Sequence, residues 1–200
     1  MENEIASRKS VFKNKNFALL FGGVLVSNIA HILFNFAMSL FVLRIAKEAF
    51  GEDIAPMIQG WYLLTAGIIL VLLMPFGGVF ADRFNKVRTM YLTDFIRGFT
   101  ILGVGAMVFL ADDPKTKIIF IFVMAVILGI NSAFFNPASQ SLLKFIVKED
   151  ELQQASSYLH GSYSLQNILG LVLGGILYAS LGIYVIFIIN GIAYIISAIT

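Results

Sequence analysis

The chain has 200 residues, of which 58% are hydrophobic and only 13% are charged. A soluble domain carries roughly 25% charged residues because its surface faces water, so much of this surface must face lipid. The net charge of +2 does not indicate nucleic-acid binding, and the absence of cysteine excludes disulfides and thiolate metal sites. We therefore expect a membrane protein without nucleic-acid partners, and we expect no cofactor and no metal.

Long apolar segments follow one another along the chain. About 20 apolar helical residues are enough to cross the hydrocarbon core of a bilayer. After a polar and basic segment at 1–16, the sequence predicts spans at 17–43, 54–81, 89–110 and 118–143. Pro137 is expected to end or bend the fourth of these helices, because proline removes one backbone hydrogen bond.

The last stretch, 152–200, carries no charge and is too long for one span. Its Ser180-Leu181-Gly182 sequence predicts a turn, which gives a fifth helix near 158–179 and a sixth helix from Ile183. The predicted fold class is an all-α membrane protein with six transmembrane helices over 17–200. Because the sixth helix ends after about 18 residues, barely a span, we expect the chain to be part of a longer one.

The distribution of basic residues predicts the orientation. Short cytoplasmic loops carry an excess of Lys and Arg. Nine such residues lie in the N-terminal segment, the second–third loop and the fourth–fifth loop, against four in the loops on the other side. We therefore expect a multi-pass protein of the cell membrane with both termini, and segment 1–16, in the cytoplasm.

The loop between the second and third predicted helices reads GGVFADRFNKVR over 77–88. This loop resembles the Gly-x-x-x-Asp-Arg signature of the major facilitator superfamily, and it lies in the expected place. Gly78 would allow two helices to approach closely, and Asp82 would face the positive end of a neighbouring helix. The plain alternative is a positive-inside loop with a turn. The gating residues that the resemblance implies in this loop are Gly78, Asp82, Arg83, Lys86 and Arg88.

The resemblance implies the N-terminal six-helix half of a transporter, whose C-terminal half is missing from this chain and would hold the partner of Asp82. Segments 15–20, 94–97, 136–138 and 169–175 resemble the efflux branch that includes macrolide-type exporters. Two positions depart from the proton antiporters of the family. Ala125 stands where they often carry an Arg, and Gly170-Leu171 stands where they usually carry Gly-Pro.

A polar stripe follows the first helix. Asn28, His31, Asn35 and Ser39 are spaced so that they share one helix face. Polar groups in hydrocarbon need a partner or a water-filled cavity. The first three are candidate substrate contacts, and Asn131 on the fourth helix is a weaker one. His31 could also carry a proton. The alternative for all of them is hydrogen bonding that only holds helices together.

Asp94 and Arg97 are three residues apart near the start of the third helix. We expect them to pair with each other or with the Asp-Arg loop, in a gate or a structural network rather than in substrate binding. Gly170 and Gly174 form a small-xxx-small face, which favours close helix packing.

Two other classes remain as alternatives. An embedded enzyme would need a nucleophile with a base, or a metal cluster, but the only histidines are His31 and His160 and no Gly-x-Ser-x-Gly occurs; we expect no catalytic residues. A channel-like or purely structural six-helix protein lacks support, because no filter loop or pore-lining charge ring is evident. The favoured interpretation is a secondary active transporter that exports small amphipathic molecules or drugs across the lipid bilayer by alternating access.

Overall fold

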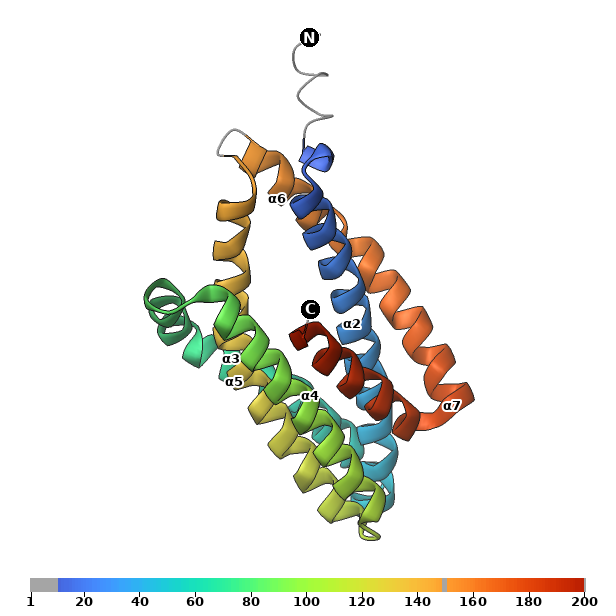
Figure 1. Ribbon diagram of the computed structural model, residues 1–200. Helices are drawn as coiled ribbons and strands as arrows, with labels where there is room; N and C mark the ends of the chain where they lie inside the picture. The colour runs from blue at the N-terminus through green and yellow to red at the C-terminus, as the bar shows by residue number, and fades with distance from the viewer. Residues whose placement is uncertain (1–10, 149–150, 200) are drawn as a thin grey trace.

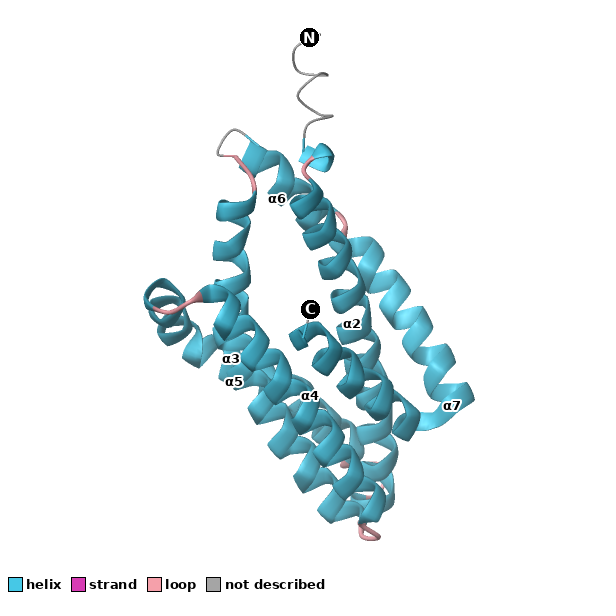
Figure 2. Cartoon of the chain, in the orientation of Figure 1, coloured by secondary structure: helices cyan, strands magenta, loops and turns pink. Residues whose placement is uncertain are grey.

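The computed structural model describes residues 11–148 and 151–199, and within them the regular structure is helical (Figure 2). A short 3-10 helix, η1, precedes the α-helices (Figure 1). The bounds of the helices are η1 Val11–Lys13, α2 Lys15–Phe50, α3 Ala55–Arg83, α4 Lys86–Leu110, α5 Pro114–Ile146, α6 Leu152–Gly161 and α7 Tyr163–Ile199. The expectation of an all-α membrane fold is therefore confirmed.

Five helical stretches of the described chain are long and apolar enough to cross a membrane. Four of them, α2 to α5, overlap the first four predicted spans. α2 and α5 extend beyond the predicted bounds at both ends, α3 begins one residue later and ends two residues later than predicted, and α4 begins three residues earlier and ends as predicted. Polar side chains cap three of these helices. Asn14 accepts from the amides of Asn16 and Phe17 at the start of α2, Asn85 accepts from an amide of α4, and Asp113 accepts from an amide of α5.

The fifth stretch, Leu152–Ile199, is 48 residues long and contains both α6 and α7. Within α7 the backbone leaves the helical conformation at Gly182, where φ is 74° and ψ is 172°. Glycine adopts a positive φ without the steric penalty that a Cβ atom brings. The ribbon turns back at this position, so the two halves of α7, 163–181 and 183–199, run in different directions (Figure 1). The turn predicted at Ser180-Leu181-Gly182 is therefore present.

The predicted start of the fifth helix near residue 158 is wrong. Residue 158 belongs to α6, which ends at Gly161, and α7 begins after Ser162. α6 is short and amphipathic, with Ala155 buried and Gln153 exposed. The absence of charge made this segment look continuous with the following span, although its polar residues face one side of a separate helix.

Pro137 does not end α5, which continues to Ile146. The ribbon of α5 changes direction in its C-terminal part instead (Figure 1). A proline inside a helix removes one backbone hydrogen bond and displaces the preceding turn, and transmembrane helices tolerate this because neighbouring groups can satisfy the freed carbonyl. Of the two predicted effects of Pro137, ending the helix is therefore wrong.

Glycine brings α3 and α5 into contact, but at a different position from the one predicted. A Cβ atom on Gly77 would lie only 1.9 Å from the carbonyl oxygen of Ala133 on α5, whereas a Cβ atom on Gly78 would meet nothing within 4 Å. Gly77 is buried and Gly78 is half-buried. The expectation that Gly78 provides the close approach is therefore wrong, because the rotation of α3 turns the preceding residue toward α5.

The small-xxx-small face of α7 packs against α2. A Cβ atom on Gly170 would lie 2.7 Å from Ile32, and one on Gly174 would lie 2.9 Å from the carbonyl oxygen of Leu33. Both distances are below 3.0 Å, so the two helices are too close together at these positions for a Cβ atom to fit between them. The packing role predicted for Gly170 and Gly174 is therefore confirmed.

Candidate functional site

A cavity of about 610 Å³ is lined by residues of α2, α3, α4, α5 and α7. We call it the polar cavity. One part of its wall is apolar and includes Leu20, Val24, Ile32, Leu70 and Met90. Polar side chains from four helices form another part, which we call the polar wall: His31, Asp94, Arg97, Ser132, Tyr194 and Ser197.

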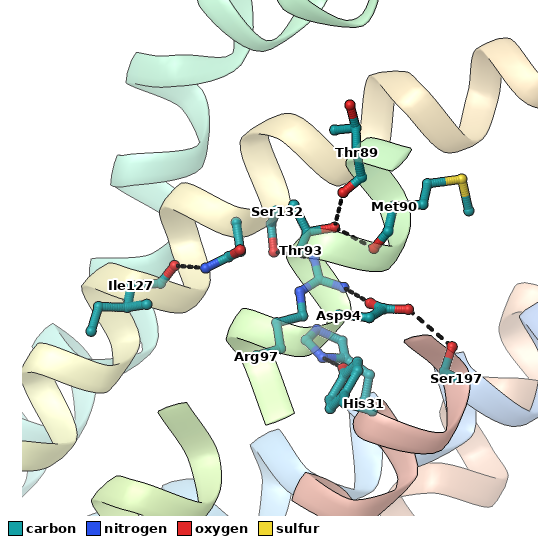
Figure 3. A network of polar contacts seen from close by, with 11 residues as sticks. His31, Thr89, Met90, Thr93, Asp94, Arg97, Ile127, Ser132 and Ser197 are labelled. Atoms are coloured by element: carbon teal, nitrogen blue, oxygen red, sulfur yellow. Dashed lines mark hydrogen bonds and ion pairs between the residues drawn. The ribbon is translucent and has the colours of Figure 1, made fainter. Parts of the chain in front are cut away.

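Asp94 and Arg97 form an ion pair in the polar wall. Their side chains are 9% and 10% exposed, and Arg97 Nη1 lies 3.5 Å from Asp94 Oδ1. Ser197 donates to Asp94 Oδ2 at 2.9 Å, and Arg97 Nη2 donates to Ser132 Oγ at 3.2 Å. Figure 3 shows the guanidinium between α4, α5 and the second half of α7. The predicted pairing of Asp94 with Arg97 is therefore confirmed, and its hydrogen-bond partners lie on α5 and α7 rather than in the Asp-Arg loop.

Two aromatic rings face the guanidinium of Arg97. Its central carbon lies 4.4 Å from the ring centre of Phe135 and 5.6 Å from that of Tyr194. Both distances are within the range of a cation–π interaction, which is stronger when the cation is removed from water. The rings therefore hold Arg97 in one orientation without occupying its N–H groups.

His31 joins the polar wall from α2. Asn35 Nδ2 lies 2.9 Å from His31 Nε2, and the hydroxyl of Tyr194 lies 3.3 Å from His31 Nδ1. In this amide orientation Asn35 donates to Nε2, so the proton of a neutral ring is on Nδ1 and points to Tyr194. His31 is exposed to the polar cavity, and Figure 3 places it beside Arg97.

The two other amides predicted as substrate contacts have partners within the bundle. Asn28 lines the polar cavity, but its amide donates to Gln166 on α7 at 2.8 Å. Asn131 is buried and donates to the carbonyl oxygen of Ile127 in its own helix at 2.8 Å. The structure thus brings His31 to Asp94 and Arg97 but does not place Asn35 or Asn131 on the cavity wall. Their substrate roles stay predictions.

The Asp-Arg loop joins α3 to α4 outside the polar cavity. Asp82, Arg83 and Arg88 are exposed, and Lys86 is half-buried. Within residues 11–148 and 151–199, Asp82 forms no ion pair with Arg83 or Arg88. The gating role of this loop, together with that predicted for Asp94 and Arg97, is not tested by these contacts and stays a prediction.

Three residues of the site were missed from the sequence: Ser132, Tyr194 and Ser197. The spacing of Tyr194 and Ser197 puts them on one helix face, which is the only signal the sequence offers. Their proximity to α4 depends on how the second half of α7 packs. No group of three or more His, Asp or Glu side chains that could hold a metal occurs in the described ranges.

The sequence model of the family named Major Facilitator Superfamily matches residues 7–200 of this chain. The MFS-type transporter YkuC of Bacillus subtilis (strain 168), itself uncharacterized, is 26% identical over 94% of this chain and 41% of its own length. The candidate bacilysin exporter BacE of the same organism is 29% identical over 68% of the chain and 34% of its own length. The lysophospholipid transporter LplT of Photorhabdus laumondii is 30% identical over 77% of the chain and 35% of its own length.

The chain spans less than half the length of these curated relatives. No solved structure matches it. The superfamily model covers nearly the whole chain, and the helices and the Asp-Arg loop occur in the order that the resemblance implies. This chain therefore belongs to the Major Facilitator Superfamily.

Proposed function

We propose that the chain is the N-terminal half of a secondary active transporter of the cell membrane, and that the whole protein exports small amphipathic molecules by alternating access. The observation that carries the proposal is the polar cavity, whose wall holds a buried ion pair inside otherwise apolar helices. Charged groups at membrane depth are costly, and those that persist mark substrate or ion pathways.

The relatives support transport and, in one case, export. BacE is named as an exporter, LplT as a transporter of lysophospholipids, and a protein of Planococcus maritimus as an antiporter of Na⁺, Li⁺ and K⁺ against H⁺. The resemblance to the macrolide-type efflux branch points the same way. In this proposal His31 contacts the substrate directly, assisted by Asn28, while Asp82 and Arg83 belong to a gate that acts against a C-terminal half.

We propose six membrane spans, with the fifth candidate stretch crossing twice; the non-helical backbone at Gly182, which divides α7 into two segments, supports this. With an even number of spans and the basic loops inside, both ends of the domain are cytoplasmic. Asn85 is exposed and lies in the turn before α4. Lys115 is exposed and lies in the first turn of α5. In this proposal Asn85 faces the cytoplasm and Lys115 faces the outside of the cell.

We expect a cysteine at position 115 to react with a membrane-impermeant maleimide in intact cells, and a cysteine at position 85 to react only after the cells are permeabilised. The reason is the positive-inside distribution of charge. The measurement compares Asn85→Cys with Lys115→Cys in a cysteine-free background. Labelling of Asn85→Cys alone in intact cells would invert the proposed orientation.

Replacing His31 by Leu is expected to lower transport by the natural full-length protein about tenfold or more, because an apolar side chain leaves Asn35 and Tyr194 without their shared partner and offers the substrate no hydrogen bond. Efflux of a fluorescent amphipathic dye from loaded cells measures this. The matched control is His160→Leu, an exposed residue of α6 outside the cavity.

His31→Gln separates two roles of this residue. Gln hydrogen-bonds but cannot titrate, so a pH profile of transport that keeps its shape assigns His31 to substrate contact. A flattened profile assigns it to proton coupling. Normal transport by His31→Leu, at equal protein levels, would remove the polar cavity from the proposed mechanism.

A further inference from the structure

The buried ion pair of the polar wall has unused hydrogen-bonding capacity. A guanidinium has five N–H donors, yet within the described residues Arg97 donates one side-chain hydrogen bond, from Nη2 to Ser132 Oγ. Asp94 Oδ1 is buried and accepts no hydrogen bond there, since its 3.5 Å approach to Arg97 is an ion-pair contact only. Buried polar atoms are nearly always satisfied, so these groups have the capacity to bind a polar ligand.

The unused groups lie together on the wall of a cavity large enough for a small molecule. Asp94 and Arg97 both line the polar cavity and come from one turn of α4. Phe135 and Tyr194 fix the guanidinium from the side, which leaves its remaining N–H groups for a ligand. The rest of the lining mixes apolar side chains such as Leu20, Val24 and Ile32 with uncharged polar ones.

We propose that the polar cavity binds zwitterionic amphipathic molecules, whose oxyanion contacts Arg97 and whose ammonium group contacts Asp94 while their apolar part lies along Leu20, Val24 and Ile32. This inference rests on the proposed transport function and names its substrate class. Amino-carboxylate and ammonium-phosphate head groups share the required chemistry.

Charge balance favours a zwitterion over a simple cation or anion. Asp94 and Arg97 together are neutral, and the other groups of the polar wall, from α2, α5 and α7, are His31, Ser132, Tyr194 and Ser197. A ligand with one net charge would bring that charge into a poorly solvated site with no counter-charge left over, which is costly. A zwitterion contributes one charge for each member of the pair and leaves the site neutral.

Three dansyl compounds with the same fluorophore test this. Nε-dansyl-lysine carries both an ammonium and a carboxylate, dansylcadaverine lacks the carboxylate, and N-dansyl-6-aminohexanoic acid lacks the amine. The natural full-length protein is reconstituted in lipid nanodiscs, and binding is measured by dansyl fluorescence. We expect the zwitterion to bind about tenfold or more tightly than either single-charge probe, since each lost charged hydrogen bond reduces affinity by that order.

The decisive variant is the double substitution Asp94→Asn with Arg97→Gln. It removes both charges at once, so it leaves no unpaired buried charge that would impair folding. We expect it to abolish the preference for Nε-dansyl-lysine. The matched control removes one exposed charge of each sign far from the cavity, by Arg44→Gln with Glu52→Gln, and should keep the preference.

Equal binding of the zwitterion and dansylcadaverine, or a preference that survives the double substitution, would overturn the zwitterion assignment. Binding of none of the three probes would also overturn it. The proposed transport function is tested separately. Its test is dye efflux in the His31→Leu and His160→Leu variants, which does not depend on these head groups.

Discussion

Replacing Gly77 by Val is expected to disrupt the packing of α3 on α5. Even the first side-chain carbon would lie 1.9 Å from the carbonyl oxygen of Ala133, which is backbone and cannot rotate away. Overpacking of a well-packed interface commonly costs about 1–3 kcal/mol and occasionally more. We expect a cost at or above the upper end of this range, because two helices must separate to accept the valine.

Gly78→Val is the matched control for this prediction. It adds the same atoms one residue later in the same helix, at a position where a Cβ atom meets nothing within 4 Å. The amount of monodisperse protein extracted from membranes and its thermal unfolding midpoint measure both variants. If Gly78→Val were the more harmful of the two, the rotation of α3 relative to α5 in the structure would be incorrect.

Replacing only one member of the Asp94–Arg97 ion pair is expected to destabilise the helix bundle strongly. Arg97→Met leaves the Asp94 carboxylate buried with Ser197 as its remaining hydrogen-bond partner, and Asp94→Leu leaves the guanidinium with Ser132. Removal of one member of a buried ion pair typically costs about 3–5 kcal/mol, whereas replacing both by apolar residues of similar size is often close to neutral. We therefore expect the double variant to be more stable than either single variant.

Reversible unfolding in mixed micelles, applied as a double-mutant cycle, measures this coupling. The exposed pair Lys47–Glu52, with side chains 41% and 80% exposed, is the control. Exposed ion pairs contribute about 0–1 kcal/mol, so its cycle should give a coupling in that range. Additive effects of Asp94→Leu and Arg97→Met would show that the two side chains do not form a buried pair.

The membrane spans could be predicted from the sequence because bilayer thickness imposes a minimum length on an apolar helix. α2 to α5 appear where apolar runs occur, and the turn before Ile183 appears where Gly182 permits a positive φ. α6 was missed because its lack of charge resembles a span, although its residues are polar on one face. Charge content alone does not distinguish an amphipathic helix from a buried one.

The polar cavity could be predicted only in part. His31 was identified because a polar stripe in hydrocarbon needs partners. The spacing of Asp94 and Arg97 on one helix made their pairing one of two expectations, beside pairing with the Asp-Arg loop. Asn131 was expected to face the cavity, but it donates to its own helix. An amide at membrane depth can be satisfied in either way, and only the packing around it selects between them.

The membrane environment, the first four spans, the turn at Gly182 and the spacing of Asp94 and Arg97 on one helix were all predictable without a structure, because each depends on local composition or on helical spacing. Only the packed helices show that Gly77 rather than Gly78 contacts α5, that Arg97 pairs with Asp94 rather than with the Asp-Arg loop, and that Tyr194 and Ser197 complete the polar wall. These facts depend on the rotation of each helix about its axis and on contacts between residues up to 163 positions apart. Such contacts arise from the packing of whole helices, which no local pattern specifies.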